Sequence, residues 1–256
     1  MRTIDAAAGP AVASRSLRAA GWALHFYTAC GTVLGLLAVL AAIDGRSLQA
    51  LWILLAALVI DGTDGILARR LRVKETIPGF DGARLDDIVD YLTYVFAPVV
   101  LLWTGGYLPG GLWGAVIAAL PLLASSVQFC RTDAKTDDQY FLGFPSYWNV
   151  VAFYVIVLNF APAVTATVLV TCAVLVFVPV KYIYPSRTTT FRALNLALAA
   201  LWVVLYAIIL LGMPEPSRIA VVLSLGYIAY YVLASVYLTL TRRPSVRAPE
   251  ALGGTS

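Results

Sequence analysis

The sequence predicts an all-α membrane protein, a polytopic bundle of about eight transmembrane helices with both termini in the cytoplasm. Of its 256 residues, 61% are hydrophobic and 12% are charged, whereas soluble domains are about 45–50% apolar and about 25% charged. Apolar segments close to the roughly 20 residues that cross a bilayer recur along the whole chain. They lie near residues 20–43, 49–70, 85–104, 111–130, 146–161, 163–182, 192–211 and 218–240.

The two ends of the chain are polar and are predicted to be tails. Residues 1–18 precede the first apolar segment without a clear small-residue cleavage site, so that segment is predicted to be a retained helix and not a signal peptide. The predicted organisation is a cytoplasmic tail at 1–18, a membrane domain at 19–240 and a polar tail at 241–256.

The basic residues predict the orientation of the bundle. With both termini in the cytoplasm and eight spans, only Arg46 and Arg218 of the 18 Lys and Arg residues lie outside. Cytoplasmic loops of membrane proteins carry an excess of Lys and Arg. The bias supports an even number of spans, although the segment at 146–161 is short and is flanked by Pro145 and Pro162.

Composition excludes several classes of function. His25 is the only histidine, so histidine-based metal sites and catalytic triads are excluded. The three cysteines, Cys30, Cys130 and Cys172, lie in or beside apolar segments, as small buried hydrophobic residues do. The net charge of +4 is explained by membrane topology, and no aromatic and basic interleaving predicts a nucleic-acid surface.

Acidic residues are concentrated between Asp61 and Asp90, at the predicted cytoplasmic ends of the second and third helices. Asp61 and Asp64 are three residues apart, and Asp86 and Asp90 are four apart. Residues at these spacings share one face of a helix. Two helices that each present two carboxylates can surround a cluster of cations, although a solvated, charge-rich helix end would carry the same residue types.

Carboxylates near the hydrocarbon are expensive, at about 2.5–3.5 kcal/mol each at a helix centre, so a bound cation is expected. Oxygen ligands without histidine or cysteine favour Mg²⁺, Mn²⁺ or Ca²⁺. Two such ions would suit phosphoryl transfer. Gly65 and Ala68 leave bare backbone on the face that carries Asp61 and Asp64, and Arg69 follows as a cation suited to phosphate.

These residues resemble the signature of the CDP-alcohol phosphatidyltransferase family. The signature consists of two Asp three apart, Gly, Ala-Arg, a second Gly and two further Asp at spacings of four. The resemblance covers at least the first six helices and implies a bacterial inner-membrane enzyme with a cytoplasmic active site, two Mn²⁺ or Mg²⁺ ions and a homodimeric assembly. Its eight positions are here Asp61, Asp64, Gly65, Ala68, Arg69, Gly82, Asp86 and Asp90.

Three further features resemble the bacterial branch of the family that makes phosphatidylcholine. Twelve residues separate Arg69 from Gly82, more than in most members of the family. The stretches FLGFPSYWN at 141–149 and KYIYPSRT at 181–188 are also similar to that branch. The implied reaction converts CDP-diacylglycerol and choline into phosphatidylcholine and CMP. Another member of the family, using serine, glycerol phosphate or inositol phosphate, is the alternative, and a cation channel or transporter is the non-enzymatic one.

The resemblance also implies roles for single residues. Asp61, Asp64 and Asp86 would bind metal, and Asp90 would bind metal and act as the general base that takes the proton of the choline hydroxyl. The CDP group would be bound by four residues of the second helix and one polar residue of the first helix. These are Asp61, Gly65, Ala68 and Arg69, together with Thr28.

A quaternary ammonium group is usually held by aromatic faces, because it cannot donate hydrogen bonds. The predicted choline pocket combines aromatic residues near the cytoplasmic helix ends with one amide, although aromatic residues also gather at membrane interfaces without binding a ligand. Tyr94 is included because it lies four residues after Asp90. The full set is Tyr94, Tyr147, Trp148, Asn149, Tyr182 and Tyr184.

Three basic residues are candidates to hold the lipid phosphate. Lys181 and Arg187 flank the second aromatic stretch, and Arg131 ends the fourth predicted helix. Anchoring by the positive-inside rule explains the same residues equally well. The expected partners are therefore CDP-diacylglycerol, choline, membrane lipid and a second copy of the chain, with no nucleic acid.

Overall fold

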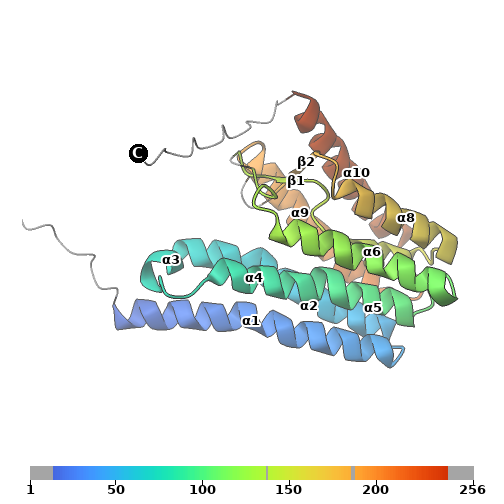
Figure 1. Cartoon of the computed structure of the whole chain (residues 1–256), viewed down its shortest axis with the longest axis horizontal. Helices are drawn as coiled ribbons and strands as arrows, with labels where there is room; N and C mark the ends of the chain where they lie inside the picture. The colour runs from blue at the N-terminus through green and yellow to red at the C-terminus, as the bar shows by residue number, and fades with distance from the viewer. Residues whose placement is uncertain (1–13, 137, 186–187, 242–256) are drawn as a thin grey trace, which may run out of the picture. The chain divides into compact units, whose positions relative to one another are not determined.

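The computed structural model describes residues 14–136, 138–185 and 188–241, and helices dominate it (Figure 1). A helix occupies part of each of the eight predicted segments, and the third segment is a continuous run of α4, a π-helical stretch η1 and α5. A short helix, α3, follows α2. The bounds are α1 Arg15–Ile43, α2 Ser47–Arg70, α3 Val73–Thr76, α4 Gly82–Asp90, η1 Tyr91–Phe96, α5 Ala97–Thr104, α6 Gly111–Cys130, α7 Trp148–Val157, α8 Pro162–Leu175, α9 Arg192–Leu211 and α10 Arg218–Thr241.

Five of the described helices, α1, α2, α6, α9 and α10, are long and apolar enough to cross a membrane. Helices α7 and α8 are apolar but shorter. The protein is therefore membrane-embedded and mostly helical, while the count of eight spans and the placement of the termini stay predictions.

Helix α1 begins at Arg15, inside the predicted tail, because the Ser14 hydroxyl accepts a hydrogen bond from the Leu17 amide at 3.3 Å and caps the helix. Helix α10 ends at Thr241, the first residue of the predicted C-terminal tail, and residues 1–13 and 242–256 lie outside the described residues.

The distribution of side chains on α1 is the reverse of that on a helix of a soluble protein. Its buried face is made of small residues such as Gly31, Gly35 and Ala38. Its exposed face carries large apolar side chains, including Phe26, which is 73% exposed, and Leu36 at 57%. Large apolar side chains on an outer face are stable against lipid tails, whereas small residues let helices approach closely.

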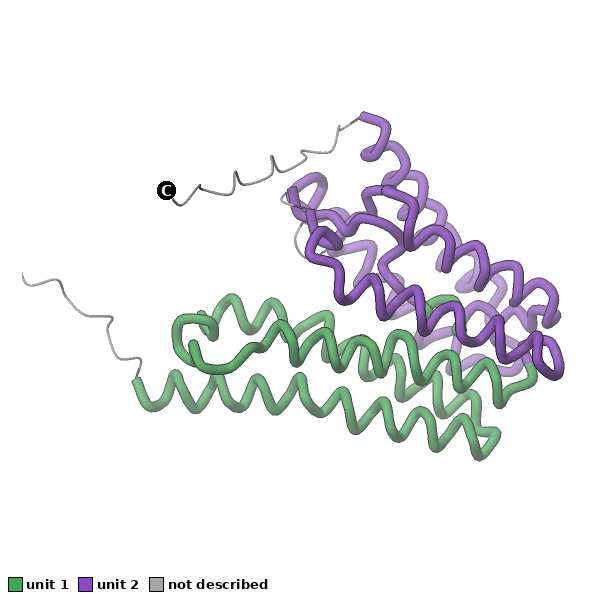
Figure 2. Tube along the Cα trace, viewed as in Figure 1, with its two compact units in different colours: residues 1–106, 148–153 green, residues 107–147, 154–256 purple. Residues whose placement is uncertain are grey.

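The chain divides into two compact units, coloured separately in Figure 2. The first unit comprises residues 1–106 and 148–153, and the second comprises 107–147 and 154–256. Helix α7 therefore contributes its first six residues to the first unit and the others to the second.

Helix α1 is the common packing partner in the first unit, since it contacts α2, α3, α4, η1 and α5. Its glycines make this possible. A Cβ atom at Gly31 would overlap Cγ1 of Val89 on α4, and one at Gly21 would lie 2.8 Å from Cδ1 of Ile77. Close approach of α1 to the helix that carries Asp86 and Asp90 therefore depends on glycine.

The second unit pairs α6 with α8 and α9 with α10, and it contains a small sheet that the all-α prediction did not include. Strands β1 (Tyr140–Leu142) and β2 (Lys181–Ile183) pair antiparallel, with Phe141 opposite Tyr182. The helix predicted over 163–182 ends at Leu175. Pro179 accounts for the difference, because proline lacks an amide hydrogen and restricts the residue before it.

Gly143 follows β1 at a position that only glycine fits. Its φ is +84°, and a Cβ atom there would overlap the carbonyl oxygen of Val176. We expect Gly143→Ala to lower the free energy of unfolding by about 1–2 kcal/mol because of the left-handed backbone conformation. The overlap with the carbonyl oxygen would lower it further, by about 1–3 kcal/mol. The matched control is Gly106→Ala, because Gly106 has φ +75° with nothing within 4 Å. Thermal unfolding in detergent compares them, and equal losses in both variants would contradict the steric contribution.

Candidate active site

Three of the four predicted metal-binding carboxylates come together in the first unit. Asp61 lies on α2, and Asp86 and Asp90 lie on α4. One carboxylate oxygen from each of the three lies within 4.8 Å of those of the other two, and all three residues are half-buried. Helix α4 begins at Gly82 because the Asp81 carboxylate accepts hydrogen bonds from the Ala83 and Arg84 amides, both at 3.1 Å.

Asp64, the fourth predicted ligand, faces α1 and is 6% exposed. Its Oδ2 accepts a 2.7 Å hydrogen bond from the hydroxyl of Thr28. The residues directly before Thr28 and Asp64 also join α1 to α2, with 2.9 Å between the hydroxyl oxygens of Tyr27 and Thr63. Thr28 therefore orients an acidic residue of the site, and its predicted contact with the nucleotide stays a prediction.

Tyr94, which follows Asp90 by four residues, bonds to Asp61, whose carboxylate belongs to the same cluster as that of Asp90. Its hydroxyl donates a 2.5 Å hydrogen bond to Oδ2 of Asp61, and the side chain is 5% exposed. Tyr94 lies in η1, the π-helical stretch that begins directly after Asp90. A π-helical stretch rotates later residues away from the positions that a continuous α-helix gives them, and such stretches occur frequently at functional sites.

Gly82, the second glycine of the signature, leaves space for the imidazole of His25. A Cβ atom at Gly82 would lie 2.8 Å from Cε1 of that ring. The ring also contacts Phe80, with 4.3 Å between the ring centroids. His25 is thus a packing residue between α1 and the start of α4, in contact with aromatic side chains.

The predicted CDP-binding residues of α2 lie on the turns that follow Asp61. Arg69 is exposed, and a Cβ atom at Gly65 would lie 3.3 Å from its Nη1 atom, so the guanidinium extends back over the glycine. Ala68 packs against the buried cluster of Leu24, Val73 and Ile77. Binding of CDP along this face stays a prediction.

The second unit connects three of the predicted choline-pocket residues through aromatic contacts. Tyr184 stacks on Phe141 at 4.4 Å between centroids, and Phe141 lies 6.4 Å from Tyr147. Tyr231 of α10 lies 6.3 Å from Tyr147 and 6.0 Å from Tyr182. Tyr182 is in β2 and not at a helix end as predicted.

Phe141 and Tyr231 were missed by sequence reasoning. Phe141 lies in the stretch at 141–149 that resembles the family branch, whereas nothing in the local sequence around Tyr231 sets it apart. The other predicted pocket residues belong to the first unit. Of these, Trp148 and Asn149 begin α7 and are buried, and Asn149 Oδ1 accepts a 2.9 Å hydrogen bond from the Val150 amide.

Two of the three basic residues predicted to hold lipid phosphate have carboxylate partners in the second unit. Lys181 is 2% exposed, and its Nζ lies 2.6 Å from Oδ2 of Asp138. Arg131 donates two hydrogen bonds to Asp133, at 2.9 and 2.8 Å, on a more exposed surface. The third residue, Arg187, lies outside the described residues, so the phosphate site stays a prediction.

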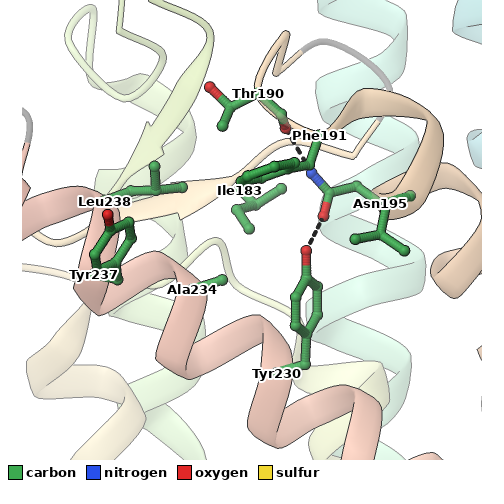
Figure 3. A pocket seen from close by; sticks show the side chains of 9 residues that line it. Ile183, Thr190, Phe191, Asn195, Tyr230, Ala234, Tyr237 and Leu238 are labelled. Carbon is green, nitrogen blue, oxygen red and sulfur yellow. Dashed lines mark hydrogen bonds between the residues drawn. The ribbon is translucent and has the colours of Figure 1, made fainter.

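A cavity of about 260 Å³ lies between the start of α9 and the second half of α10 (Figure 3). Its walls are mostly apolar, and none of the predicted site residues lines it. Two polar residues close one side. The Tyr230 hydroxyl donates a 2.7 Å hydrogen bond to Asn195 Oδ1, and Asn195 Nδ2 donates a 3.0 Å bond to the carbonyl of Thr190. The first bond joins α10 to α9, and the second ties Asn195 to the segment that precedes α9.

The fold and the carboxylate cluster define a helical membrane protein with an oxygen-rich site suited to a hard divalent cation. Comparison with known proteins specifies the class further. The CDP-alcohol phosphatidyltransferase family model matches residues 25–240, and the chain belongs to this family.

Several relatives that carry the name phosphatidylcholine synthase are similar over most of their length. The one from Legionella pneumophila is 39% identical over 227 residues, which cover 86% of this chain and 89% of the relative. The one from Borreliella burgdorferi is 35% identical over 87% of this chain and 95% of the relative. The one from Pseudomonas aeruginosa is 38% identical over 84% and 90%.

Proposed function

We propose that this protein transfers the phosphatidyl group of CDP-diacylglycerol to choline, which gives phosphatidylcholine and CMP. The observation that carries the proposal is the cluster of Asp61, Asp86 and Asp90, whose carboxylate oxygens lie within 4.8 Å of one another at the signature positions of the family. The choice of choline rests on the relatives named phosphatidylcholine synthase and on the long segment between Arg69 and Gly82.

The residues present fit a divalent cation. Asp61, Asp86 and Asp90 would hold it, with Asp64 completing the set, and carboxylate oxygens are the ligands that Mg²⁺ and Mn²⁺ prefer. A bound cation would offset the negative charge of the pyrophosphate. Two ions are expected from the family resemblance.

Asp90 is proposed as the general base. The choline hydroxyl is a weak nucleophile, and a carboxylate within hydrogen-bond reach takes its proton as the oxygen attacks the phosphorus next to the glycerol. The bond from that phosphorus to the CMP oxygen then breaks, and CMP leaves with the electron pair. The proton passes from Asp90 to water before the next cycle.

The substrates are assigned to the predicted residue sets. CDP would lie along Gly65, Ala68 and Arg69, where the exposed guanidinium can pair with phosphate oxygens. The ring network that includes Tyr147, Tyr182 and Tyr184 supplies aromatic faces of the kind that bind quaternary ammonium groups. Lys181, Arg187 and Arg131 are the proposed contacts of the lipid phosphate.

The proposed location is the bacterial inner membrane, with eight spans and the active site at the cytoplasmic face. The distribution of Lys and Arg supports this orientation. A water-soluble acceptor and a lipid donor can both reach a site at that face. A homodimer is expected from the family resemblance.

The reaction is tested with the purified full-length protein in detergent, incubated with CDP-diacylglycerol, Mn²⁺ and a panel of alcohols. We expect CMP release with choline, formation of phosphatidylcholine, and loss of both on addition of EDTA. The acceptors for comparison are serine, glycerol phosphate and inositol phosphate.

The panel tests the acceptor, the metal requirement and the enzymatic assignment separately. Release of CMP with serine and none with choline would overturn the acceptor but retain the family reaction. Undiminished release after exhaustive chelation would overturn the metal requirement. No release with any of the alcohols would overturn the enzymatic assignment altogether.

A further inference from the structure

The hydrogen bond between Tyr94 and Asp61 lies inside the first unit. It joins α2 to the π-helical stretch η1 that follows α4. Asp61 comes from α2, and Tyr94 comes from η1, which continues α4 after Asp90. The donor–acceptor distance of 2.5 Å is at the short end for a hydroxyl and a carboxylate. A bond of this kind fixes the rotation of the carboxylate about its side chain.

We propose that Tyr94 is a positioning residue, whose hydroxyl holds the Asp61 carboxylate in the orientation that binds the divalent cation. This inference rests on the metal site of the proposed function. Partners in the second coordination shell orient metal ligands, and their loss typically costs about 10–100-fold in metal affinity. Tyr94 is 5% exposed, so its own rotamer is restricted by packing.

The backbone around Tyr94 supports this role. Six residues, Tyr91–Phe96, adopt the wider π-helical turn immediately after the last acidic residue of the signature. The neighbouring Thr93 is 2% exposed and uses its hydroxyl within the same helix, donating to the Val89 carbonyl at 3.0 Å. Tyr94 instead directs its hydroxyl across to α2. Two adjacent buried hydroxyls thus have different partners, one in the helix backbone and one in the acidic cluster.

The test is Tyr94→Phe, which removes the hydroxyl and retains the ring. Mn²⁺ affinity is measured on the purified full-length protein from the free-ion signal in electron paramagnetic resonance. We expect the dissociation constant for Mn²⁺ to rise about 10–100-fold. Thr93→Val is the matched control, because it removes a buried hydroxyl from the same turn without altering a carboxylate contact, and we expect wild-type Mn²⁺ affinity.

Kinetics give a second measurement that distinguishes positioning from other roles. For Tyr94→Phe we expect the Mn²⁺ concentration at half-maximal rate to rise by a similar factor, kcat to recover at saturating Mn²⁺, and KM for choline to stay unchanged. An unchanged Mn²⁺ affinity together with a raised KM for choline would overturn the inference and favour the predicted place of Tyr94 in the choline pocket.

The remaining outcomes are also decisive. Unchanged Mn²⁺ affinity in Tyr94→Phe beside a wild-type protein that binds Mn²⁺ would overturn the positioning role alone. Equal losses of affinity in Tyr94→Phe and Thr93→Val would assign the effect to general disturbance of the turn, and would also overturn it. A wild-type protein that binds no Mn²⁺ would overturn the metal site and this inference together.

Discussion

Asp90→Asn is expected to abolish phosphatidyl transfer while CDP-diacylglycerol still binds. Asparagine preserves the size of the side chain and one oxygen ligand, but its amide cannot accept the proton of the acceptor hydroxyl. General acid–base catalysis contributes about 10²–10⁴-fold to rates, so a loss of at least this size is expected in kcat. CMP release and equilibrium binding of CDP-diacylglycerol, both in the presence of Mn²⁺, measure the two effects separately.

The matched control for Asp90→Asn is Asp87→Asn. Asp87 lies on the same helix, α4, and outside the group of three whose oxygens come together. We expect this control to transfer at close to the wild-type rate. Turnover of Asp90→Asn near the wild-type rate would refute the assignment of Asp90 as the base, and a loss of lipid binding equal to the loss of rate would reduce its role to metal binding.

The second large effect is expected at the ion pair of Lys181 and Asp138 in the second unit. Lys181 is 2% exposed, so Asp138→Asn would leave its ammonium group buried without the carboxylate 2.6 Å away. Removing one partner of a buried ion pair costs about 3–5 kcal/mol, and the partial exposure of Asp138 favours the lower end of this range. Chemical unfolding in detergent measures the change in the free energy of unfolding.

Two further variants separate stability from lipid binding. We expect Lys181→Met to destabilise the protein by a similar amount, and the double variant Lys181→Met with Asp138→Leu to recover much of the loss, because an apolar pair of similar volume can replace a buried ion pair. The proposed contact of Lys181 with the lipid phosphate predicts in addition a raised KM for CDP-diacylglycerol in Lys181→Met. Unchanged stability in Asp138→Asn would contradict the structural role of the ion pair.

The ion pair also predicts a dependence of stability on pH. Burial raises the pKa of Asp138, but hydrogen bonds from Lys181 and Thr136 and the charge of Lys181 outweigh it, so the pKa lies below its ordinary value. A carboxyl group with a lowered pKa stabilises the fold at pH above its unfolded pKa of about 3.9, and this stabilisation is lost as pH falls through the folded pKa. We expect that part of the acid sensitivity to be absent in Asp138→Asn.

Much of the candidate site follows from the sequence because its geometry is local. The spacing from Asp61 to Asp64 and from Asp86 to Asp90 places each pair on one face of its helix, whatever the rest of the chain does. The helix start at Gly82 is local too, since the Asp81 cap lies in the adjacent residue. Residues 140–142 and 181–183 are different, because a short strand needs a partner, and the two lie far apart in the chain.

The sequence by itself therefore determined the helical membrane class, the acidic residues of the site and the family that they indicate. Tertiary structure alone decided that Asp64 pairs with Thr28, that Tyr94 donates its hydrogen bond to Asp61, and that Tyr231 joins the aromatic network. The physical reason is that positions along one helix are fixed by its backbone repeat. Contacts between helices depend on packing, on glycines such as Gly31 and on a π-helical turn, whose effects extend beyond any local pattern.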